Sequence, residues 1–114
     1  MRDHQSLKVF ELAHQLVLEV YRASHVSPRD ERYGLTAQLR RGAVSVAANV
    51  VEGCSRRSNK EFVRFLEIAF GSVREVGYYL MLGRDLGYLT RSLAAALSAF
   101  IRARHRSEQE SGKA

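Results

Sequence analysis

The sequence lacks the residues and runs on which several classes of protein depend. Its 114 residues include one cysteine, Cys54, which excludes a disulfide framework and any multi-cysteine zinc or iron–sulfur site. No apolar run approaches the roughly 20 residues of a membrane span. Residues 1–5 do not contain the apolar core of a secretion signal. We therefore expect a reduced, cytoplasmic setting and no membrane partner.

What the sequence does have is an excess of positive charge, and this excess is unevenly placed. Lys and Arg number 18 against 12 Asp and Glu, a net charge of +6. Residues 32–64 carry seven of the bases and two of the acids, so they hold +5 of the total. Fifteen of the bases are Arg, the side chain suited to bidentate contact with phosphate. The pattern favours an anionic partner such as nucleic acid, and a solvated surface with internal Arg–Glu pairs explains it equally well.

The chain is expected to be all-α. It has a single proline and few strand-like alternations. Short connections favour an antiparallel up-down four-helix bundle, forming one domain over 1–106 with a frayed polar tail over 107–114. Apolar residues at three- and four-residue spacing predict helices over 6–24, 35–52, 58–82 and 90–104.

Several residues indicate where these helices begin and end. Gly53 is a typical C-terminal stop for the second helix. Ser58 with Glu61 has the spacing of a capping box and predicts the start of the third helix. Gly83 and Gly87 mark the break before the fourth helix.

The third helix has one clear apolar face. The residues expected on that face are Phe62, Phe65, Leu66, Ala69, Val73, Val76 and Leu80. Gly71 and Gly77 are expected to permit close approach of a neighbouring helix.

The second helix is apolar over about two-thirds of its circumference, whereas a helix with one buried face needs an arc of only about 100°. The extra width predicts a second packing surface, most simply another copy of the chain. The alternative is a helix that is central to its own fold and touches neighbours on both sides. The predicted oligomer interface consists of Ala37, Val44, Ala47, Ala48 and Val51.

A narrow polar stripe remains on the second helix. It consists of Gln38, Arg41, Ser45, Asn49 and Glu52. This stripe either lines a cleft shared between copies or is satisfied inside the bundle.

A long ordered string of residues resembles a known family. Residues 33–53 read Tyr-Gly-Leu-Thr-Ala-Gln-Leu-Arg-Arg-Gly-Ala-Val-Ser-Val-Ala-Ala-Asn-Val-Val-Glu-Gly, and 56–62 read Arg-Arg-Ser-Asn-Lys-Glu-Phe. With 68–75 and 85–89, they resemble the four-helix-bundle proteins encoded in intervening sequences of bacterial 23S ribosomal RNA genes. That family also includes the accessory variability determinant of diversity-generating retroelements. Two positions depart from the pattern: Ala47 stands where proline is frequent, and Gly42 stands where alanine is usual, a local helix weakening of about 1 kcal/mol.

The resemblance implies a four-helix protomer that assembles as a ring-like homopentamer. In the retroelement branch it implies a basic assembly that binds nucleic acid and a reverse transcriptase. For the intervening-sequence branch the resemblance supplies no activity that could be carried over to this chain.

The residues themselves favour binding over catalysis. The four histidines are far apart in the chain, and none has the spacing of a metal-ligand pair, so we expect no metal, no cofactor and no enzyme activity. Cys54 is interpreted as a small loop residue rather than a nucleophile. The residues predicted to bind nucleic acid are Arg40, Arg41, Arg56, Arg57, Lys60 and Arg64.

This binding is expected to be salt-dependent and weakly sequence-specific, through contacts with RNA or DNA phosphates. No aromatic platform is expected among these bases, so base stacking of the kind used by single-strand binders is not predicted. The competing hypothesis is a scaffold protein whose Arg residues pair internally and between subunits.

Overall fold

The computed structural model describes residues 3–24 and 34–87. Over these ranges every regular element is a helix: a short 3-10 turn η1 (His4–Ser6) is followed by α1 (Lys8–Ser24), α2 (Leu35–Cys54) and α3 (Asn59–Asp85). The all-α prediction is therefore confirmed for the described ranges. The predicted fourth helix over 90–104 and the tail over 107–114 lie outside them.

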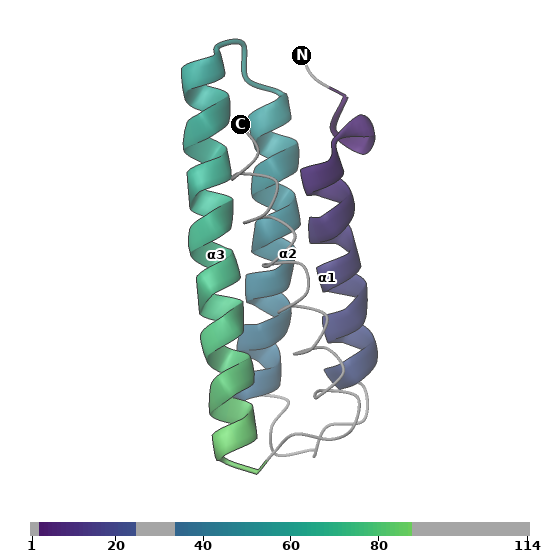
Figure 1. Ribbon diagram of the computed structural model, residues 1–114, viewed down its shortest axis with the longest axis vertical. Coiled ribbons are helices and arrows are strands. Elements are labelled where there is room, and N and C mark those ends of the chain that lie inside the picture. Colours follow the sequence, from purple (N-terminus) through teal and green to yellow (C-terminus); the bar gives the residue numbers. More distant parts are fainter. Residues whose placement is uncertain (1–2, 25–33, 88–114) are drawn as a thin grey trace, which may run out of the picture.

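Helix α2 lies between α1 and α3 and packs against both (Figure 1). The three helices alternate in direction, so the start of α1, the end of α2 and the start of α3 share one end of the molecule (Figure 1). Part of the wide apolar surface of α2 is therefore explained by the alternative interpretation, in which the helix is central to its own fold.

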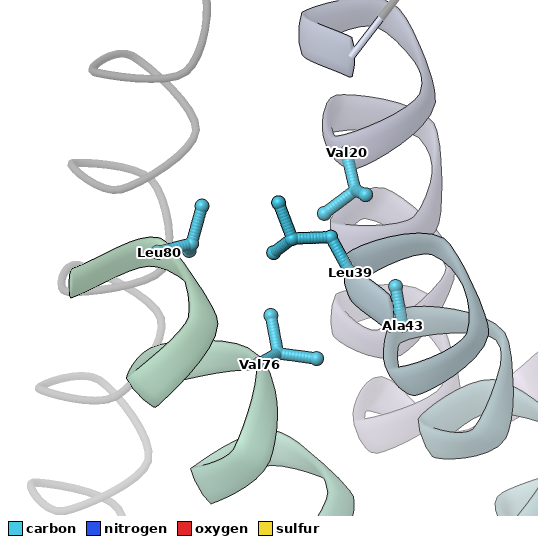
Figure 2. Packing of buried hydrophobic residues seen from close by; sticks show 5 residues of the cluster. All are labelled: Val20, Leu39, Ala43, Val76 and Leu80. Atoms are coloured by element: carbon cyan, nitrogen blue, oxygen red, sulfur yellow. The ribbon is translucent and has the colours of Figure 1, made fainter. Parts of the chain in front are cut away.

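The core forms where the three helices converge. One cluster contains buried side chains from all three, namely Val20, Leu39, Ala43, Val76 and Leu80 (Figure 2). A second cluster lies nearer the end formed by the α2–α3 turn and contains Ala13, Val46, Val50 and Ala69. The predicted apolar face of α3 is confirmed, because Ala69, Val76 and Leu80 are buried there.

The structure confirms one predicted helix boundary and corrects two. Ser58 caps α3, and its Oγ accepts a hydrogen bond of 3.1 Å from the backbone N–H of Glu61. Gly53 does not stop α2, because it lies inside the last turn and is buried. Gly83 likewise lies inside α3 and is buried, and Gly87, with a φ of 75°, follows the end of the helix.

Gly42, Gly53 and Gly83 allow side chains of a neighbouring helix to approach the helix backbone closely. A Cβ atom added at Gly42 would lie 2.9 Å from Cγ2 of Val76, and Cβ atoms added at Gly53 or Gly83 would each meet a side chain at 3.0 Å. Gly71 is different, because a Cβ there would meet nothing within 4 Å. The prediction that Gly71 permits close helix approach was wrong. The same expectation for Gly77 stays a prediction.

We expect Gly42→Ala to lower the free energy of unfolding by about 1 kcal/mol. Alanine favours the helix by about 1 kcal/mol, but its Cβ overlaps the buried and conformationally stiff Val76 side chain, and such overpacking costs about 1–3 kcal/mol. The matched control is Gly71→Ala, which should raise the free energy of unfolding because its Cβ enters open space. Urea unfolding followed by circular dichroism compares the two, and equal gains in stability would contradict the close approach at Gly42.

Candidate nucleic-acid interface

Three exposed cations gather where α2 gives way to α3. Arg57 lies in the turn itself, and Lys60 and Arg64 lie one helical turn apart on the first part of α3. We call Arg57, Lys60 and Arg64 the basic turn. The backbone N–H groups at the capped start of α3 add a favourable dipole for an anion at the same place.

Arg56 belongs to the same turn, but its side chain is held by the protein. Its guanidinium forms an ion pair with Glu52, one turn earlier on α2. The guanidinium carbon also lies 4.7 Å from the centre of the Phe65 ring on α3. These contacts fix the side chain, which still remains 39% exposed.

The other two predicted cations lie elsewhere on α2. Arg40 donates from Nε to the hydroxyl of Ser24 (2.7 Å), and its guanidinium carbon lies 4.6 Å from the centre of the Tyr21 ring. Arg41 is exposed on α2, about 22 Å along the helix axis from Arg56. The six predicted residues therefore form a group of four at the turn, while Arg40 and Arg41 lie toward the far end of α2.

Of the predicted interface residues, three lie on an exposed face of α2. Val44 is 42% exposed, Val51 is 37% exposed, and Ala48 between them is exposed. We call this set the α2 outer face. Ala37 is half-buried, and Ala47 packs against the core of its own chain.

Ile68 is an exposed apolar residue of α3 that the prediction did not include. It is 43% exposed. It lies one turn before Ser72, whose hydroxyl is hydrogen-bonded to that of Ser45 on α2 (2.9 Å). Ile68 therefore lies on the side of α3 that borders α2.

The central residues of the polar stripe on α2 form hydrogen bonds within the protein. Asn49 donates from Nδ2 to the backbone carbonyl of Ser45 (2.8 Å) and to its hydroxyl (3.1 Å), and that hydroxyl reaches Ser72. The centre of the stripe is thus satisfied between α2 and α3. Gln38 and Arg41 toward one end of the stripe and Glu52 at the other are exposed.

The described residues offer little for other chemistry. Within 3–24 and 34–87, no three His, Cys, Asp or Glu side chains come together as a metal site. None of the helices in these ranges is both long and apolar enough to cross a bilayer. Cys54 is the last residue of α2 and is 2% exposed, so its interpretation as a loop residue was wrong.

Comparison with known proteins identifies the family. A family described as "23S rRNA-intervening sequence protein" matches residues 5–105, which is most of the chain. The chain belongs to this family. The expected resemblance to the intervening-sequence proteins is therefore confirmed, whereas the link to the retroelement branch stays a prediction.

A solved structure is similar in fold to this intervening-sequence family member. It is a protein of unknown function from the S23 ribosomal protein family of Bacteroides thetaiotaomicron, with a TM-score of 0.70 and 19% sequence identity. The alignment covers 83% of this chain and 90% of that one. At this identity the likeness concerns the fold alone. A search of curated proteins found no match.

Proposed function

We propose that this protein is a non-enzymatic, homo-oligomeric four-helix bundle that binds RNA or DNA through phosphate contacts at the basic turn. The observation that carries the proposal is the grouping of Arg57, Lys60 and Arg64, all exposed, around the capped start of α3. Exposed cations on a helix terminus contact phosphates without reading base edges. Binding of this kind depends strongly on salt and weakly on sequence.

Self-association is the second part of the proposal. Packing of α2 against α1 and α3 leaves Val44, Ala48 and Val51 exposed, so the α2 outer face remains after both neighbours are in place. An exposed apolar surface of this kind is typical of a protein–protein contact. The ring of five copies follows from the resemblance, and it would repeat the basic turn and raise affinity through avidity.

The role as an accessory to a reverse transcriptase rests on the resemblance to the retroelement branch alone. A second candidate function, a scaffold without nucleic-acid binding, is favoured by a specific observation. Arg56 is paired with Glu52, and Arg40 is held by Ser24, so two of the six predicted cations are already engaged within the chain.

Salt titration separates the two candidates. We expect the protein to bind a single strand of about ten nucleotides, with log K falling linearly against log salt at a slope of about −2 per protomer, since three cations neutralise about three phosphates. Fluorescence anisotropy at several salt concentrations measures the slope. Absence of binding at about 0.15 M salt, with no slope to measure, would favour the scaffold.

A further inference from the structure

We propose that Arg56 provides a stacking surface for one base of a single-stranded nucleic acid, beside the phosphate contacts of the basic turn. This inference rests on the proposed function and names the form of nucleic acid that the turn prefers. It departs from the sequence-based expectation of no stacking, because an aromatic ring from α3 lies against Arg56 across the turn.

The first step is the geometry of the guanidinium. Its carbon lies over the Phe65 ring, 4.7 Å from the ring centre. Glu52 takes the Nη2 atom, and Nε is buried. The Arg56 side chain is nevertheless 39% exposed, so part of it remains accessible to a ligand.

The second step is what such a surface binds. Guanidinium planes and aromatic rings are the groups on which unstacked bases pack in complexes with single strands. Arg56 is already ordered by Phe65 and Glu52, so little side-chain freedom remains to be lost when a base packs on it. In a duplex the bases are paired and stacked on one another, and they cannot reach this surface without unstacking.

The third step is the surroundings. Arg57 and Lys60 are exposed within a few residues of Arg56, so a strand whose base lies on Arg56 has cations available for its flanking phosphates. Arg40 provides a comparison within the same chain. It stacks on Tyr21 in the same way, but it lies about 24 Å along α2 from Arg56, away from the basic turn.

The test uses two strands of the same length, about ten nucleotides. One is oligothymidine, and the other is an abasic strand that keeps every phosphate and carries no base. We expect the wild-type protein to bind oligothymidine about tenfold more tightly, because stacking of one base contributes about that much. Arg56→Lys keeps the charge and the pairing to Glu52 but loses the flat face. It should lower the affinity for oligothymidine about tenfold and leave the affinity for the abasic strand unchanged.

Two further variants complete the design. Phe65→Leu keeps apolar volume but removes the ring, and it should reproduce the Arg56→Lys result. Arg40→Lys removes the guanidinium that lies over Tyr21, and it should change neither affinity. Equal binding of both strands by the wild type, or an equal loss for both strands in Arg56→Lys, overturns the stacking inference and leaves phosphate binding intact. Failure of the wild type to bind either strand overturns the proposed function and the stacking inference together.

Discussion

Replacing Arg57 and Lys60 together by glutamate is expected to weaken the binding of a single strand about 100-fold at about 0.15 M salt. Each substitution removes a phosphate contact and puts a repelling carboxylate in its place. The slope of log K against log salt should become shallower, its magnitude decreasing by more than one unit per protomer, since two neutralised phosphates are lost. Fluorescence anisotropy with the same labelled strand measures both quantities.

The double substitution should not disturb the fold. Arg57 precedes the N-cap of α3 and Lys60 lies in its first turn, where acidic side chains interact favourably with the helix dipole. Neither Arg57 nor Lys60 is buried. The circular dichroism spectrum and the unfolding midpoint should therefore match the wild type, so that a loss of binding reports on the contact itself.

A matched control changes the net charge by the same amount at the opposite end of the bundle. Arg22 near the end of α1 and Arg84 near the end of α3 are both exposed, and each pairs with an exposed acidic neighbour, at 4.0 Å and 3.2 Å. Helix α3 is about 40 Å long, so Arg84 lies far from the basic turn. Arg22→Glu with Arg84→Glu should reduce affinity only slightly. If it reduces affinity as much as the change at the turn, attraction is a property of overall charge and the basic turn is not the site.

Features that depend on local sequence were predictable in this chain. The all-α character follows from apolar spacing, and the cap at Ser58 follows from a hydroxyl three residues before Glu61. The roles of the glycines were harder to predict, because a glycine at a helix end and a glycine under a neighbouring side chain look alike in sequence. Gly87 has a left-handed φ, whereas Gly53 is buried against Phe62 and Phe65, which the α2–α3 turn brings back onto α2.

The candidate site was predictable only in its composition. The Glu52–Arg56 pair has the four-residue spacing of a helix ion pair, so this partner of Arg56 was visible in the sequence. The contact with Phe65 was not visible, because it joins two helices across a turn and Phe65 also fits the apolar face of α3. From the sequence the six predicted cations therefore look equivalent. In the fold, Arg40 and Arg56 lie against aromatic rings, whereas the other four side chains are exposed.

The wide apolar surface of α2 is a second case in which residues that look alike in sequence have different surroundings in the fold. Ala47 and Val44 look alike as small apolar residues on one helix, but Ala47 packs into its own core and Val44 is 42% exposed. Only the placement of α1 and α3 distinguishes them. The residues left exposed on the α2 outer face after this division are those that self-association would bury.

The last prediction concerns that face. We expect Val51→Asp, and separately Val44→Asp, to convert the oligomer into monomers at micromolar concentration, while the wild type sediments as an oligomer. A carboxylate buried against an apolar partner without a compensating contact costs several kcal/mol, and in a closed ring the cost recurs at every interface. The helix itself tolerates the change, because both side chains project from the protomer surface.

Leu86→Asp is the matched control, since Leu86 is 53% exposed at the end of α3, away from the α2 outer face. It should leave the oligomer intact in sedimentation velocity. A monomeric wild type would refute self-association, and an oligomer that survives both valine substitutions would place the interface on another surface. Monomers produced by Val51→Asp should keep the salt slope of each basic turn but bind a long strand more weakly, because avidity requires several turns on one particle.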